Sequence, residues 1–149
     1  MQSNRQAFVH VYVIAVAFNY PWELAQSALF TPASHKGNVW LNCFIASLGD
    51  GVMVLLLLAL GWLAFERRDW FVHPRPHVYG ALAAAGLVLG GAVEWVAVHV
   101  LERWTYTDAM PRVPVLEIGV VPILQMVLLP ALIFQVSARA LGLTGRQRA

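Results

Sequence analysis

Four long apolar stretches alternate with short polar ones along the 149 residues of the chain. The apolar stretches cover residues 7–30, 39–65, 78–101 and 113–141. Each is at least as long as the roughly 20 residues that a helix needs to cross a bilayer, and tilt can absorb some excess length. Because backbone groups in lipid must be hydrogen-bonded within the protein, each stretch is expected to be helical. The pattern predicts an all-α fold, a single domain over residues 1–149 that forms a bundle of four transmembrane helices.

The composition supports a membrane location. Hydrophobic residues make up 59% of the chain and charged residues 12%, whereas a soluble domain carries about 25% charged residues. The net charge is only +2, and no basic cluster is interleaved with aromatic residues, so nucleic acid is not an expected partner. The polar start is very short and the first apolar run is too long for a signal peptide, so the first helix is expected to be retained. We expect an integral protein of the bacterial inner membrane.

The basic residues predict an orientation in the membrane. Seven of the ten fall on one side of the predicted bundle, namely Arg5, Arg67, Arg68, Arg75, Arg139, Arg146 and Arg148. The positive-inside rule therefore places both termini and the loop at 66–77 in the cytoplasm. In that loop, Trp70 and Phe71 are expected to anchor the chain at the membrane interface.

Carboxyl groups lie within the apolar stretches. They belong to Glu23, Asp50, Glu94 and, near a boundary, Glu117. A charged group at the bilayer centre costs about 2.5–3.5 kcal/mol on insertion scales, so chance is a poor explanation for a set of them. Counted from the outer ends of their helices, Glu23, Asp50, Glu94 and Gln125 lie at depths that agree within about two helical turns. The four helices are therefore expected to share one polar layer in the outer half of the membrane.

Helical spacing places further polar and small residues on the faces that carry these carboxyl groups, because residues four apart share a face. Such sets are Asn19, Glu23 and Ser27, with Gln26 alongside, and Gly86, Gly90 and Glu94. The glycine pair would let a neighbouring helix approach closely. Pro21 and Pro122 would each leave one backbone carbonyl without its helical donor. Together these features predict a kinked, polar chamber that opens toward the outer face.

The segment 102–112 lies on the same side as the polar layer and is rich in aromatic and charged residues. Either Arg103, Trp104 and Tyr106 cap the chamber, with Arg103 paired to Glu102 or Glu94, or they belong to an ordinary interfacial loop. The candidate catalytic residues are Glu23, Asp50 and Glu94. The candidate substrate-binding residues are Asn19, Trp22, Gln26, Trp95, Trp104, Tyr106 and Gln125. For Asn19, Gln26 and Gln125, hydrogen bonding between helices is the structural alternative.

No cofactor is expected. A four-helix cytochrome needs paired membrane histidines at equal depth, and the two within the apolar stretches, His10 and His99, lie near opposite faces. The single cysteine, Cys43, cannot form an internal disulfide, and the chain has no cysteine pair to bind zinc. A metal held by carboxylates alone in the bilayer is not expected either.

The residues Asn19-Tyr20-Pro21-Trp22-Glu23 form an N-x-x-W-E pattern within a predicted membrane helix. This pattern resembles a motif of the integral-membrane terpene cyclases of the meroterpenoid type and is similar to that of small sterol-isomerase-like membrane proteins. The resemblance covers one helix of four. It implies a membrane carboxylic acid that protonates an alkene or epoxide, or shifts a double bond, in a lipophilic substrate. By motif position Glu23 would donate the proton and Trp22 would stabilise a cation, while Asp50 or Glu94 would take the second acid/base role. The chain also resembles short bacterial membrane proteins of unassigned function.

Three functions remain open from the sequence. The first is a membrane-embedded acid/base enzyme, such as a cyclase or double-bond isomerase, that acts on an isoprenoid-like lipid. The second is a carrier or binding protein for a lipophilic or cationic small molecule, with the carboxylates as counter-ions or a proton relay. The third is an accessory subunit of a larger membrane complex. A lipid or lipophilic small molecule is the expected ligand, and either a homo-oligomer or a partner membrane subunit is compatible with the sequence.

Overall fold

The computed structural model describes residues 4–34, 37–67, 69–72 and 74–146. Within these residues the fold is helical, as predicted. The four long helices are α1 (Asn4–Gln26), α2 (Val39–Phe65), α3 (Pro76–Trp95) and α4 (Val120–Arg146). Short elements join them: the 3₁₀ turns η1 (Ser27–Leu29) and η2 (Pro32–Ser34), the π-helical turn η3 (Val96–Val100) at the end of α3, and the antiparallel strands β1 (Arg112–Val113) and β2 (Ile118–Gly119).

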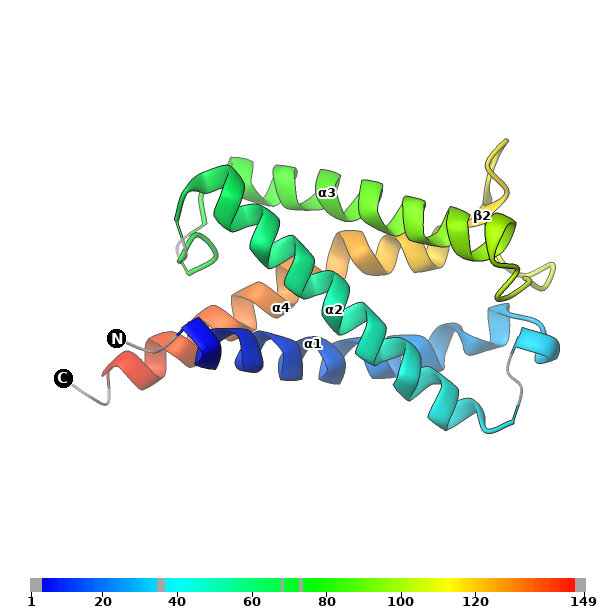
Figure 1. Cartoon of the computed structure of the whole chain (residues 1–149), viewed down its shortest axis with the longest axis horizontal. Coiled ribbons are helices and arrows are strands. Elements are labelled where there is room, and N and C mark those ends of the chain that lie inside the picture. Colours follow the sequence, from blue (N-terminus) through cyan, green and yellow to red (C-terminus); the bar gives the residue numbers. More distant parts are fainter. Residues whose placement is uncertain (1–3, 35–36, 68, 73, 147–149) are drawn as a thin grey trace.

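The two ends of the molecule differ (Figure 1). The start of α1, the end of α4 and the described residues of the α2–α3 connection (66–67, 69–72 and 74–75) lie together at one end, which we call the terminal end. The other end, which we call the loop end, carries the segments 27–34, 37–38 and 101–119. Helix α1 packs against α2 and α4, and α3 packs mainly against α4. Helices α2 and α3 meet near their connection at the terminal end and diverge toward the loop end.

Three helical segments are long and apolar enough to cross a membrane: Val39–Phe65, Pro76–Val100 and Val120–Gly142. This finding indicates an integral membrane protein. Helix α1 is less apolar because His10, Asn19 and Glu23 interrupt its hydrophobic run. Within the described residues, three of the four predicted stretches thus have the length and composition of a membrane-spanning helix.

Helix boundaries match the prediction best for α2, which runs over 39–65 as expected. At its start, the side-chain oxygen of Asn38 accepts hydrogen bonds from the backbone amides of Trp40 at 2.9 Å and Leu41 at 3.4 Å. This N-cap satisfies donors that the first helical turn leaves free. Helix α1 ends at Gln26 rather than at residue 30, so Ser27 leaves the predicted face and enters η1.

The expected helix over 113–119 is wrong. The chain there forms the β1–β2 hairpin, in which Val115 has φ 72° and Glu117 has φ 51°. Glu117 consequently lies outside the helix, with its carboxylate 3.6 Å from the guanidinium of Arg112. Pro122 falls in the first turn of α4, where a missing N–H costs no helical hydrogen bond, so it does not kink the helix. The proline inside α4 is Pro130.

A hydrophobic core fills the terminal end. It includes Leu57, Leu58, Ile133 and Phe134, together with Trp70 and Phe71. The prediction that Trp70 and Phe71 anchor the membrane interface is wrong, because they are only 5% and 3% exposed. The Trp70 ring lies against Gly61, where a Cβ would clash, and its Nε1 donates a hydrogen bond to the carbonyl of Leu58 at 3.3 Å.

The close approach predicted for the glycine pair on α3 is confirmed. A Cβ on Gly86 would overlap the backbone carbonyl of Met126, and a Cβ on Gly90 would lie 3.0 Å from the Met126 side chain. Pro130 has no N–H to offer the Met126 carbonyl, so this carbonyl faces α3 without its usual helical partner. The tight α3–α4 contact sets the position of Glu94, one turn beyond Gly90, relative to Gln125.

Candidate functional site: a cavity lined by three carboxyl groups

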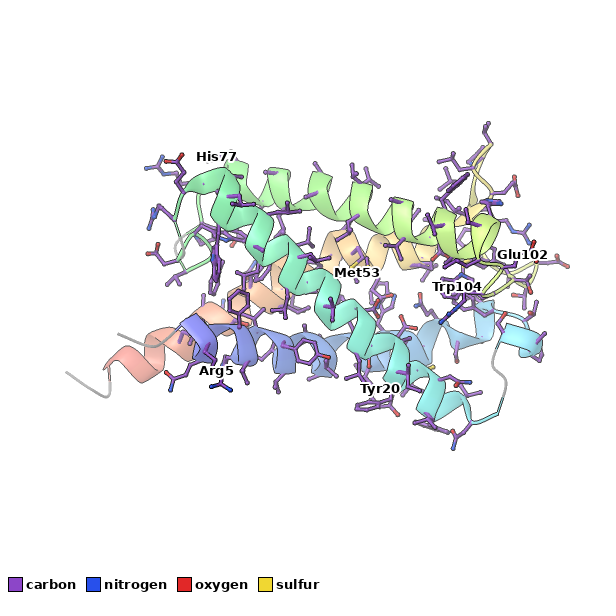
Figure 2. All side chains as sticks on the ribbon, in the orientation of Figure 1. Arg5, Tyr20, Met53, His77, Glu102 and Trp104 are labelled. Atoms are coloured by element: carbon purple, nitrogen blue, oxygen red, sulfur yellow. The ribbon has the colours of Figure 1, made fainter. Side chains whose placement is uncertain are left out.

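A cavity of about 570 Å³ lies among the four helices near the loop end. Its size falls in the range of small-molecule sites. Glu23 of α1, Asp50 of α2 and Glu94 of α3 all line it, together with Gln26 and Gln125. Met53 and Trp104, labelled in Figure 2, are two further lining residues. The polar layer expected from matched depths is therefore one shared cavity wall.

Gln125 of α4 joins the other helices to one another. Its Nε2 donates to Asn19 Oδ1 at 2.8 Å and to Asp50 Oδ2 at 2.9 Å, and its Oε1 accepts from Gln26 Nε2 at 3.1 Å. The residue is 2% exposed. With both amide hydrogens and the carbonyl oxygen used, the side chain has a single satisfied orientation. It thereby holds the Asp50 carboxyl group in a fixed position.

Gln26 positions Glu23 in a similar way. Its Nε2 also donates to Glu23 Oε1 at 2.6 Å, and its Oε1 accepts from the Trp22 indole at 3.3 Å. Trp22 packs against the hydrophobic core and is not among the residues that line the cavity. Its indole acts on the site through Gln26.

The carboxyl groups of Glu23 and Asp50 lie next to each other on the cavity wall and interact directly. Each group accepts a hydrogen bond from one amide, Gln26 for Glu23 and Gln125 for Asp50. We call these two residues the carboxyl pair. Two ionised carboxylates are acceptors only, so a hydrogen bond between the two groups forms when one of them carries a proton. In that state the pair combines one acidic proton with one proton-accepting oxygen inside the cavity.

Glu94 is held differently, by two neutral donors. It is 4% exposed, and its Oε1 accepts hydrogen bonds from the phenol of Tyr106 and, at 3.3 Å, from the indole of Trp104. The Tyr106 oxygen in turn accepts from the backbone amide of Gly119 at 2.9 Å. Burial and the hydrogen bond to Glu94 raise the pKa of Tyr106 above its ordinary value, so the phenol remains a donor at neutral pH.

The predicted pairing of Arg103 with Glu102 or Glu94 is wrong. Among the residues that the structure describes, the ion pairs within 4.0 Å are Arg67–Asp69 and Arg112–Glu117. The side chain of Arg103 instead lies at the rim of the cavity. The π-turn η3 and the left-handed conformation of Glu102, with φ 46°, turn the chain back so that Trp104 and Tyr106 reach Glu94.

Two loop segments close the cavity toward the loop end. The backbone amide of Thr31 donates to the carbonyl of Thr105 at 2.9 Å, and that of Thr107 donates to the carbonyl of Leu29 at 2.9 Å. The Thr31 and Thr105 hydroxyls lie 2.6 Å apart, and the Phe30 ring packs against Trp104 and Tyr106. We call the paired segments 27–34 and 103–107 the cap. The contribution of segment 27–34 to the cap was not predicted, because pairing between loops that are distant in sequence leaves no local sequence pattern.

The remaining predicted residues lie away from the cavity. Asn19 is fully buried behind Gln125 and donates to the backbone carbonyl of Ala15 at 2.8 Å. Trp95 is 44% exposed and packs against His99. Conversely, the cavity wall includes residues that the sequence analysis did not select as ligand-binding, among them Cys43, Met53 and Met126. Apolar lining residues have no sequence signal that distinguishes them from core residues.

In the described part of the chain, no three His, Cys, Asp or Glu side chains come together as a metal site requires. No family model, curated protein or solved structure matches this chain. The N-x-x-W-E resemblance therefore stays a prediction, and the function must be argued from the geometry of the cavity.

Proposed function

We propose that this protein is a membrane-embedded acid/base enzyme, of the cyclase or double-bond isomerase type, that acts on a lipophilic, isoprenoid-like substrate. The observation that carries the proposal is the adjacent pair of carboxyl groups, Glu23 and Asp50, on the wall of the cavity. General acid/base catalysis needs a proton donor and a proton acceptor within reach of the reacting carbons. The carboxyl pair supplies both.

In this proposal Glu23 donates its proton to one carbon of an alkene, which leaves a carbocation on the neighbouring carbon. Asp50, as the carboxylate, removes a proton from an adjacent carbon, and the double bond re-forms in a new position. The pair again holds one proton, and the hydrogen bond between the two groups returns it to Glu23. For a cyclisation, a second alkene attacks the cation before the proton is lost. The indole ring of Trp104 on the cavity wall can stabilise the cation through its π face.

The pairing favours Asp50 over Glu94 for the second acid/base role. Asp50 lies next to Glu23 and interacts with it directly, whereas the Oε1 of Glu94 already accepts from Tyr106 and Trp104. Glu94 would then stabilise the cap and contribute to the electrostatic potential of the cavity rather than transfer a proton.

The test uses proton exchange, because the substrate need not be known in advance. The protein is incorporated into vesicles made from lipids that co-purify with it, the vesicles are incubated in D₂O, and the lipids are examined by mass spectrometry. Protonation of an alkene carbon followed by loss of hydrogen should introduce deuterium at carbon. Glu23→Gln should slow this exchange by about 10²–10⁴-fold, the usual contribution of general acid/base catalysis.

The matched control is Glu66→Gln, which neutralises an exposed carboxylate at the end of α2, outside the cavity. This variant should exchange at the wild-type rate. An equal rate for Glu23→Gln and the wild type would contradict the proposed chemistry.

A second candidate is a binding or carrier protein for a lipophilic cation. It is favoured by the balance of charged groups in the cavity lining, where three carboxyl groups face one basic side chain, Arg103. This candidate predicts saturable binding of tetraphenylphosphonium that Asp50→Asn removes, with no deuterium entering any lipid. The acid/base enzyme predicts deuterium incorporation.

The proposal includes a membrane topology in which α1 also crosses the bilayer and both termini face the cytoplasm. The basic residues of the terminal end support it through the positive-inside rule. In this topology the cavity lies in the outer half of the membrane.

A further inference from the structure

We infer that the cavity is entered sideways from the lipid, through an opening between α2 and α3, and that its occupant is an amphipathic lipid with a flexible apolar chain. The inference deepens the proposed function by naming the substrate class, and it rests on that function only in calling the occupant a substrate.

The cap lies across the loop end of the cavity. Its two segments are joined by backbone hydrogen bonds between Thr31 and Thr105 and between Thr107 and Leu29. On the α3–α4 side Gly86 contacts the Met126 backbone. On the α1–α4 side Gln125 is hydrogen-bonded to Asn19 and Gln26. A ligand that enters through any of these three sides would have to break one of these contacts.

Among the residues that the structure describes, no comparable contact joins α2 to α3 beside the cavity. The two helices diverge from the terminal end toward the loop end (Figure 1), and the cavity is lined from both of them. On α2 the lining residues Ile45, Ala46 and Gly49 are exposed, with Ile45 57% exposed. On α3, Val93 lines the cavity and is 40% exposed. We call the gap between these residues the entrance.

At Gly49, beside Asp50, the entrance is not narrowed by a side chain. A Cβ placed on Gly49 would meet no atom within 4 Å, so the space in front of this glycine is open. In the membrane this space faces acyl chains rather than water. A molecule dissolved in the bilayer therefore reaches Asp50, the next residue along α2, without crossing the headgroup region.

An apolar groove outside the cavity continues from the same opening. It has a volume of about 470 Å³ and shares Val93, Arg103 and Trp104 with the cavity. Its other lining residues are Ala92 of α3, Val96 and Ala97 of η3, and Leu101, which follows η3. A ligand whose reactive end lies at the carboxyl pair can thus extend its chain along α3 in contact with both the groove and the lipid. This continuity favours a ligand longer than the cavity itself.

Chemical labelling of a native cysteine can test this route. Cys43 is the only cysteine, and it lines the cavity. In vesicles, N-dodecylmaleimide dissolved in the bilayer should label Cys43, whereas a permanently charged, water-soluble thiosulfonate should not. Gly49→Trp places a large ring in the entrance without a clash at Cβ and should abolish labelling by N-dodecylmaleimide.

Gly80→Trp is the matched control. Gly80 is also exposed on a membrane helix and also has nothing within 4 Å of an added Cβ, but it does not line the cavity. This variant should be labelled like the wild type. Met53→Cys in a Cys43→Ala background repeats the test at a second lining position.

Three results would overturn the inference: labelling by the charged reagent as fast as by N-dodecylmaleimide, equal labelling of Gly49→Trp and Gly80→Trp, or no labelling at either position. The result is separable from the proposed chemistry, because Glu23→Gln should lose deuterium exchange and keep its labelling. Labelling that fails while exchange persists would overturn the entrance alone, and the reverse would overturn the chemistry alone.

Discussion

The carboxyl pair and Glu94 line one cavity, yet their surroundings differ. Glu23 and Asp50 lie next to each other, and each accepts a hydrogen bond from an amide group, that of Gln26 or Gln125. Glu94 accepts from the phenol of Tyr106 and the indole of Trp104, both of which belong to the cap. Depth in the membrane therefore does not by itself determine the role of a carboxyl group. The role depends on the groups to which the carboxyl group is hydrogen-bonded.

The two arrangements suit two tasks. A pair of carboxyl groups that shares a proton can give and take protons without a large rearrangement. A carboxyl group whose oxygen accepts from two neutral donors is instead a fixed anchor, and here it links α3 to the cap. We therefore expect substitutions in the pair to change chemistry and substitutions around Glu94 to change stability and access.

The largest effect should come from Asp50→Asn. The amide keeps the shape of the side chain but cannot act as a base, so deuterium exchange into lipid should fall by about 10²–10⁴-fold. The melting temperature should change little, because an asparagine at this position can still accept from Gln125. Glu94→Gln is the direct comparison, and it should retain most of the exchange activity. Equal losses in the two variants would remove the distinction between the pair and Glu94.

A smaller effect, on stability, is expected for Tyr106→Phe. Removing the hydroxyl leaves Glu94 without its phenol donor and the amide of Gly119 without its acceptor. Unsatisfied buried polar groups cost about 1–3 kcal/mol, so the melting temperature should fall. Tyr79→Phe is the control, since the Tyr79 hydroxyl makes no hydrogen bond within the described structure. Unchanged melting of Tyr106→Phe would show that Glu94 does not anchor the cap.

The smallest effect is expected for Thr31→Val in the cap. This change removes the hydroxyl contacts with Thr105 and Ser34 but keeps the backbone hydrogen bond between Thr31 and Thr105. The free energy of unfolding should fall by about 1 kcal/mol, because each of the two solvent-accessible hydrogen bonds contributes about 0.5 kcal/mol, the low end of the usual range. Labelling of Cys43 by the charged thiosulfonate should rise above the wild-type level, because the cap then opens more often. Ala33→Val, an exposed position in the same segment, should leave both measurements unchanged.

Much of this arrangement could be predicted from the sequence where one helix carries the information. The limits of α2 follow from its apolar run and its Asn38 cap, and the close α3–α4 contact follows from Gly86 and Gly90. The shared polar layer followed from counting residues along each helix, because the rise per residue is constant.

The predictions from the sequence were wrong where segments that are distant along the chain interact. Residues 113–119 are apolar enough to suggest a helix, but pairing of Arg112 with Gly119 and the left-handed Val115 and Glu117 make a hairpin. Trp70 and Phe71 were predicted to lie at the membrane interface because they are aromatic residues beside arginines. In the structure both are buried, and the Trp70 ring packs against Gly61. The partner of Glu23 was likewise open from the sequence, because depth alone fits Asp50 and Glu94 equally well. Tertiary contacts decide such cases, and periodicity within one helix does not report them.

Infrared difference spectroscopy of the purified protein in lipid tests most directly whether Glu23 and Asp50 share one proton. A protonated carboxyl group has a carbonyl stretching band that a carboxylate lacks, and this band shifts in D₂O. We predict one such band from the carboxyl pair, lost or shifted in both Glu23→Gln and Asp50→Asn and unchanged in Glu94→Gln. A band that survives both substitutions in the pair, or that disappears only in Glu94→Gln, would contradict the account.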